Sequence, residues 1–244
     1  MEKASPTPTT TTWRPLYRTG AIAPLVALAL YIGEFALMAF GEPFPATIEE
    51  WYALAQRSKL LTLCYLNSPD MISFSLLGVM FLALYVALRH VHPSRMLTAL
   101  YFAVLGAVTF IVPRALHLAL LPLSDLHAAA TSEAQRAIYL AAGEGLSQVS
   151  TATPQTLGFL FMAVAGLLVS LVILQSRFFG QAAAYVGIAG FAAALASFTA
   201  RLIAPTVASV LMPINGLLWF AWWIMISVGL FKLAKVTAEK EVGR

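Results

Sequence analysis

The sequence predicts an all-α integral membrane protein, a bundle of six or seven transmembrane helices with two amphipathic helices at its outer interface. Of its 244 residues 60% are hydrophobic and only 11% are charged, and the mean hydropathy is +0.81. A soluble domain is about one quarter charged, so this chain has too little polar surface to cover a core in water. The second observation is a series of long apolar stretches separated by polar or proline-containing segments.

Six stretches approach or exceed the roughly 20 apolar residues that a transmembrane helix needs. They are residues 21–40, 71–88, 96–121, 156–174, 181–203 and 214–233. We expect a Pro/Thr-rich disordered tail at 1–13, one transmembrane domain at 14–235 and a cytoplasmic tail at 236–244. A cleaved signal peptide is the alternative for the first stretch. Its length, the presence of Glu34 and the lack of a small-residue cleavage site favour a span.

Two segments between the spans have amphipathic character. Residues 47–66 alternate charged and apolar side chains, which predicts a helix in the interface, and residues 128–150 predict a second one. If 47–66 crosses the membrane instead, there are seven spans and every later segment inverts. Asn67-Ser-Pro-Asp70 predicts a helix break before the second span, and residues 205–213 predict a turn. Pro113 predicts a kink in the third span.

The net charge of +4 predicts an orientation rather than nucleic-acid binding, because the basic residues lie mostly in loops and tails. With six spans, both termini, the 89–95 loop and Arg177 fall on one side. The other side carries most of the acidic loop residues. The positive-inside rule then predicts cytoplasmic termini in a bacterial plasma membrane. The single cysteine, Cys64, cannot form an intrachain disulfide.

The ionisable residues within and beside the spans gather at one predicted depth, towards the outer leaflet. The candidates for catalysis are Glu34, Asp70, Arg114, His117 and Glu144, and the candidates for ligand binding are Asn67, Gln148, Arg201 and Asn215. Arg114 and His117 are three residues apart and share a helix face. An arginine at this depth costs several kcal/mol without a partner, so we expect Arg114 and Arg201 to pair with carboxylates.

This constellation allows two interpretations. Such ion pairs could only stabilise the packing of the helix bundle, or they could line a polar pocket in the outer leaflet. In a pocket, His117 and a carboxylate could perform acid–base chemistry, and Arg114 suits a phosphate or carboxylate headgroup. One histidine with carboxylates is a poor zinc site, and no cofactor motif is present. No nucleophile elbow surrounds any serine, which disfavours a serine hydrolase.

Several short motifs resemble a known family. RPLYRTGAIAPL before the first span, Asn67-Ser-Pro-Asp70, LYVALRHVHPSR after the second span and RFFG between the fourth and fifth resemble a bacterial membrane family, the domain of unknown function 4386. The resemblance spans roughly residues 14 to 235. It implies six or seven inner-membrane spans, no assigned activity and no catalytic residues to transfer.

The function predicted from these residues is binding of, or action on, a lipid or other amphipathic ligand in an outer-leaflet polar pocket. Whether a reaction occurs is left open. The alternatives are a structural or accessory subunit with purely structural ion pairs, and a transporter, which predicts polar groups in the inner halves of the spans as well. The expected partners are membrane lipids, with no nucleic acid, metal or cofactor, and the sequence does not determine an oligomeric state.

Overall fold

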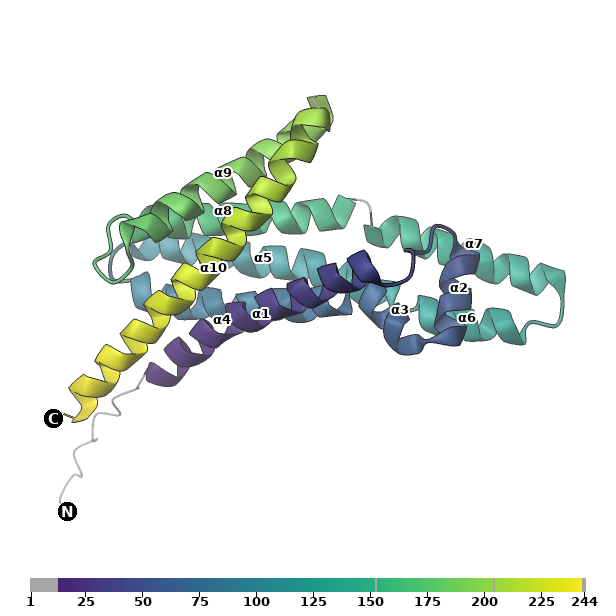
Figure 1. Ribbon diagram of the computed structural model, residues 1–244, viewed down its shortest axis with the longest axis horizontal. Helices are drawn as coiled ribbons and strands as arrows, with labels where there is room; N and C mark the ends of the chain where they lie inside the picture. Colours follow the sequence, from purple (N-terminus) through teal and green to yellow (C-terminus); the bar gives the residue numbers. More distant parts are fainter. Residues whose placement is uncertain (1–12, 152, 204, 243–244) are drawn as a thin grey trace, which may run out of the picture.

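A computed structural model of the protein describes residues 13–151, 153–203 and 205–242. This part of the chain is all α-helical, which confirms the predicted fold class (Figure 1). Its helices are α1 (Arg14–Phe40), α2 (Ile48–Arg57), α3 (Lys59–Tyr65), α4 (Ser68–Leu88), α5 (Pro93–His117), α6 (Leu120–Ala129), α7 (Glu133–Thr151), α8 (Thr153–Ile173), α9 (Gln181–Ile203) and α10 (Pro205–Val242).

Six of these helices are long and apolar enough to cross a membrane, namely α1, α4, α5, α8, α9 and α10. They pack as a closed ring in that order along the chain, with α10 returning to α1. Each helix therefore buries one side against two neighbours and exposes the other, as the many exposed large apolar side chains show. This arrangement suits lipid, which is as apolar as the exposed face.

The centre of the ring is filled with aromatic side chains. Phe191 of α9 contacts both Trp219 and Trp222 of α10, with ring centroids 5.3 and 5.0 Å apart. Tyr31 of α1 lies 5.7 Å from Trp223. The cavity left between these rings measures about 10 Å³, room for roughly one water molecule. The bundle is thus closed by aromatic packing below its polar end.

The four remaining helices form a cap at the end of the molecule opposite the two termini (Figure 1). We use the name cap for residues 41–67 and 118–151, which contain α2, α3, α6 and α7. Here α2 packs on α6 and α7, and α6 packs on α7. The helices α2 and α3 have only 10 and 7 residues, too short to cross a bilayer. Residues 47–66 therefore belong to the cap, and the structure has six candidate spans.

Several predicted boundaries are wrong. Helix α1 begins at Arg14 rather than near residue 21, because its first turn accommodates Pro15. The helix predicted at 128–150 begins at Glu133 as α7, and the residues before it form the separate helix α6, which ends at Ala129. The predicted turn at 205–213 is the start of α10, which contains Pro213 and continues to Val242. Proline is tolerated inside a transmembrane helix, so it was a poor signal for a turn here.

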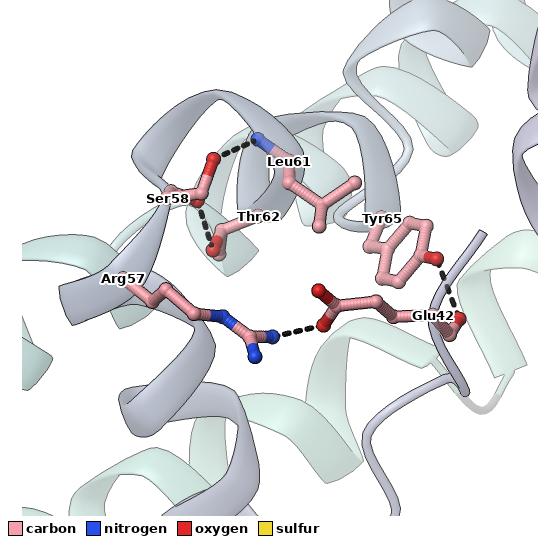
Figure 2. A network of polar contacts seen from close by, with 6 residues as sticks. All are labelled: Glu42, Arg57, Ser58, Leu61, Thr62 and Tyr65. Carbon is pink, nitrogen blue, oxygen red and sulfur yellow. Dashed lines mark hydrogen bonds and ion pairs between the residues drawn. The ribbon is translucent and has the colours of Figure 1, made fainter.

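Polar contacts tie the start of the cap together (Figure 2). The guanidinium of Arg57 pairs with the carboxylate of Glu42, and the hydroxyl of Tyr65 donates to the backbone carbonyl of Glu42 at 2.7 Å. Ser58 separates α2 from α3 and caps α3, with its hydroxyl accepting from the backbone N–H of Leu61 at 3.2 Å. These contacts hold the 41–47 loop against α3.

Further contacts join α2 and α3 to the second half of the cap. Lys59 pairs with Asp125 at 2.8 Å, and the side-chain amide of Gln56 donates to the same carboxylate at 2.9 Å. The Tyr52 hydroxyl donates to the backbone carbonyl of Tyr139 on α7 at 2.7 Å. Burial raises the pKa of Tyr52 above its ordinary value, so the phenol stays a donor at neutral pH.

Helices α5 and α8 approach most closely where two glycines face each other. A Cβ on Gly106 would lie 2.9 Å from the backbone oxygen of Gly158, and one on Gly158 would lie 2.9 Å from the Cβ of Phe110. Small residues at such crossings let helix backbones touch, which is a main source of packing energy between membrane helices.

We predict that Gly106→Ala lowers the free energy of unfolding by about 1–3 kcal/mol, because the new methyl group overpacks the contact with the α8 backbone. Denaturation by sodium dodecyl sulfate, followed by circular dichroism, measures this. Gly78→Ala is the matched control, since a Cβ at Gly78 of α4 meets nothing within 4 Å. Equal effects of both substitutions would show that the glycine contact is not responsible.

Candidate functional site

A layer of polar side chains separates the hydrophobic core of the bundle from that of the cap. The two cores are distinct clusters: the bundle core includes Phe74 and Phe110, and the cap core includes Trp51, Leu66 and Leu120. Three helices pass from one core to the other, and each carries polar residues at the crossing. We call Glu34, Asn67, Asp70, Arg114 and His117 the inter-core layer.

The order of residues along each helix shows this arrangement. On α1, Tyr31 packs against the bundle core and Leu37 against the cap core, with Glu34 between them. At the start of α4, Asn67 and Asp70 lie between Leu66 of the cap core and Phe74 of the bundle core.

Helix α5 repeats the pattern in the third crossing. Arg114 and His117 lie between Phe110 of the bundle core and Leu120 of the cap core. The five residues of the layer therefore come from three helices and share one level.

Asn67 joins the two carboxyl groups of the layer. Its side-chain amide donates to Glu34 Oε1 at 3.1 Å and to Asp70 Oδ2 at 3.3 Å. Its backbone is left-handed, with φ 62° and ψ 32°, the only positive φ at a non-glycine residue in the described chain. Asparagine tolerates this conformation better than most residues. The break between α3 and α4 thus aims one amide at both acids.

Arg114 is buried in this layer without an ion pair. Only 4% of its surface is exposed, and in the described chain no carboxylate lies within 4.0 Å of its guanidinium nitrogens. The expected direct pairing of Arg114 with a carboxylate is therefore wrong. Asp70 and Glu34 nevertheless act on it electrostatically, so it lies near both. Its guanidinium stacks over Phe110, with 5.6 Å between Cζ and the ring centroid.

Buried polar atoms in the layer are left without partners. Among the described residues, Arg114 Nε, Asp70 Oδ1 and both ring nitrogens of His117 are buried and make no hydrogen bond, and the Ser73 hydroxyl one turn below Asp70 makes none either. An unpaired buried donor or acceptor costs about 1–3 kcal/mol, and a charged group costs more. So many such atoms in one layer point to polar groups supplied from outside the chain.

Aromatic rings form the floor and roof of the layer. Below it, the rings of Phe74 and Phe110 stack with centroids 3.9 Å apart and an interplanar angle of 4°. The phenol of Tyr31 lies close enough to interact with Asp70. Above it, the indole of Trp51 on α2 lies 6.2 Å from the ring of His117. The layer is therefore enclosed by apolar surfaces on both sides.

Other residues predicted for the site lie outside the layer. Glu144 and Gln148 are exposed on α7 and line a cavity of about 470 Å³ between α2 and α7. Asn215 is half-buried on α10, and its Oδ1 has no partner in the described chain. Arg201 belongs to α9, but its side chain lies outside the described residues. The sequence pattern placed these four at a common depth without showing which of them meet.

The sequence analysis missed Tyr31 and Trp51 as neighbours of the site. Both are aromatic residues in apolar or amphipathic segments, where they are normally core residues. A signal for Tyr31 existed, since it lies three residues before Glu34 on the same helix face. No local signal connects Trp51 with His117, because the contact joins residues of different helices 66 positions apart.

The chemistry that the layer offers is acid–base and ionic. Two carboxyl groups lie near the guanidinium of Arg114, and the imidazole of His117 lies near the same guanidinium, so the layer can hold a charged or zwitterionic group and exchange a proton with it. Within the described residues no group of three or more His, Cys, Asp or Glu side chains could hold a metal ion.

The six long apolar helices and the helical cap define a multi-pass membrane protein with a polar layer between two cores. The family model described as domain of unknown function (DUF4386) matches residues 55–229. The protein belongs to this family, and the resemblance inferred from its motifs is confirmed. No curated protein and no solved structure matches the sequence. The family carries no assigned activity, so function rests on the residues of the layer.

We predict that Asn67→Ala lowers the free energy of unfolding by about 1–2 kcal/mol more than Asn67→Gly, because alanine strains the left-handed backbone and glycine does not. Both variants lose the amide that joins Glu34 and Asp70. Denaturant titration of the two variants beside the wild type measures the difference. The decrease in the free energy of unfolding that both variants share measures the contribution of the Asn67 amide. Equal stability of the two variants would contradict the backbone effect.

Proposed function

We propose that the inter-core layer binds the polar headgroup of an amphipathic ligand, such as a membrane lipid, in the outer leaflet of a bacterial plasma membrane. The observation that carries the proposal is the set of buried, unpartnered polar atoms on Arg114, Asp70 and His117. Ionisable groups at membrane depth are costly and mark functional sites by default. A headgroup with hydrogen-bond donors and acceptors would offset that cost.

The lack of an ion pair at Arg114 favours this proposal over a purely structural role. If Arg114 had a purely structural role, its guanidinium would contact a carboxylate directly, as the basic side chains of the exposed ion pairs in the cap do. In the layer, Asn67 occupies one oxygen of each carboxyl group, and Arg114 Nε remains free of protein partners in the described chain. A phosphate or carboxylate is the natural partner for such a guanidinium.

Chemistry on the bound ligand is a further part of the proposal. His117 provides an imidazole that can accept a proton, and Glu34 and Asp70 provide carboxyl groups in the same layer. A transporter is less well supported. The ring centre below the layer is filled by aromatic side chains, and the cavity there is about the size of one water molecule.

The orientation follows from the charges at the two ends. The starts of α1, α5 and α9 and the ends of α4, α8 and α10 lie at one end of the molecule (Figure 1). A group of basic residues lies in or beside these helix ends: Arg14, Arg18, Arg89, Arg95, Arg177, Lys232 and Lys235. In the cap, Arg57, Lys59 and Arg136 each pair with an acid. By the positive-inside rule we place the termini in the cytoplasm and the cap outside.

We predict that Arg114→Gln removes a retained lipid while leaving the protein folded. Nanodiscs containing phosphatidylethanolamine and phosphatidylglycerol, followed by detergent extraction and native mass spectrometry, count the lipids that stay bound. We expect affinity to fall by about 10- to 100-fold, corresponding to one lost charged hydrogen bond.

Arg57→Gln is the matched control, because Arg57 is an exposed arginine whose ion pair lies in the cap. It should retain lipid like the wild type. If wild type, Arg57→Gln and Arg114→Gln are all folded and retain the same lipids, the layer is not the binding site.

A further inference from the structure

Trp51 lies beside the inter-core layer and also lines a water-facing cavity. The cavity of about 470 Å³ between α2 and α7 is lined by Ala46, Thr47, Ile48, Glu49, Trp51, Glu144, Ser147 and Gln148. Trp51 is therefore shared between two surroundings, since its indole also lies 6.2 Å from the ring of His117. The same side chain thus borders the polar cavity and a buried imidazole with two unpartnered nitrogens.

The helix that carries Trp51 packs its buried face on α6 and α7 but is held at one end by exposed contacts. Helix α2 has 10 residues, and the charged contacts at its C-terminal end, Arg57 with Glu42 and Lys59 with Asp125, are exposed. Exposed ion pairs are worth about 0–1 kcal/mol each. The indole itself packs edge-on against Phe44, with centroids 5.1 Å apart, and Phe44 is 54% exposed on the 41–47 loop.

The chain crosses between bundle and cap at points where its helices are interrupted. Helix α1 ends at Phe40, the left-handed Asn67 separates α3 from α4, and α5 ends at His117 before α6 begins at Leu120. Interruptions of this kind absorb the φ/ψ changes of a moving element. The cap can therefore shift over the layer at two of these crossings, whereas α1 continues past Glu34 to Phe40.

We infer that the cavity between α2 and α7 is the entrance through which water and small neutral or cationic solutes reach the inter-core layer, with the indole of Trp51 as its gate. The ionisable side chains that line it, Glu49 and Glu144, are both acidic, so the entrance repels anions. The inference rests on the proposed function of the layer as a binding site. It adds a polar route from the outer face, separate from the lipid-exposed side of the bundle.

Cysteine accessibility tests the gate. The chain has one cysteine, so a Cys64→Ser background with His117→Cys carries a single thiol in the layer. In nanodiscs, a cationic trimethylammonio-ethyl and an anionic sulfonato-ethyl methanethiosulfonate are the probes, each normalised to its rate with a free thiol. We expect Trp51→Ala to raise the cationic rate about ten-fold, the effect of losing roughly one aromatic contact.

Leu54→Ala is the matched control on the same helix. Leu54 is buried in the cap core and lines a different cavity, on the side of α2 that faces the 41–45 loop. We expect it to change the rate less than two-fold, roughly the scatter of mutations that leave a contact intact. If Trp51→Ala has no effect, or Leu54→Ala has the same effect, Trp51 is not the gate.

The charge selectivity has its own test. Glu49→Gln combined with Glu144→Gln should reduce the ratio of cationic to anionic rates about three-fold, as expected for removing two surface charges near the path. An unchanged ratio would overturn the assignment of this cavity as the path.

A second measurement keeps the native histidine, in case the cysteine variant does not fold. Diethyl pyrocarbonate modifies neutral imidazoles, and peptide mass spectrometry resolves His117 from the exposed His90. Trp51→Ala should accelerate modification of His117 and leave that of His90 unchanged. Neither measurement needs a ligand. If Trp51→Ala accelerates modification but the wild type retains no lipid, the proposed function is contradicted and the entrance is not. If the wild type retains lipid but Trp51→Ala has no effect on modification, the entrance is contradicted and the proposed function is not.

Discussion

The cost of keeping Arg114 away from water is the constraint on which the rest of the site depends. A guanidinium at membrane depth lowers the stability of the folded protein by several kcal/mol unless nearby groups compensate its charge. In this protein the compensation is indirect, because the ring of Phe110 lies under the guanidinium and the carboxyl groups of Glu34 and Asp70 lie near it. In the described chain the amide of Asn67 donates to one oxygen of each carboxyl group.

This indirect compensation explains why the molecule has two cores. The polar residues of α1, α4 and α5 must lie where neither core requires an apolar side chain. The boundary between bundle and cap is the one level that all three helices share. The same boundary interrupts the chain at Asn67 and after His117. A site placed there is closed by the aromatic filling of the bundle below and by α2 above.

The site and its surroundings differ in how firmly they are built. The floor is a stack of Phe74 and Phe110 within the bundle, where packing is tight and helix backbones touch at Gly106. The roof is a short helix with exposed charged contacts. Binding sites commonly combine a rigid base with a weakly held cover, because the cover must move while the base keeps the binding groups in position.

The sequence by itself determined the class of protein, the existence of six helices long and apolar enough to span a membrane, and the break at Asn67. These depend on composition and local pattern, which are visible one segment at a time. Only the tertiary structure decided that Asn67 bridges Glu34 and Asp70, that Arg114 lacks an ion pair, and that Glu144 belongs to an outer cavity. Helix rotation and neighbour order decide which side chains meet, and the polar pattern of one helix does not specify either.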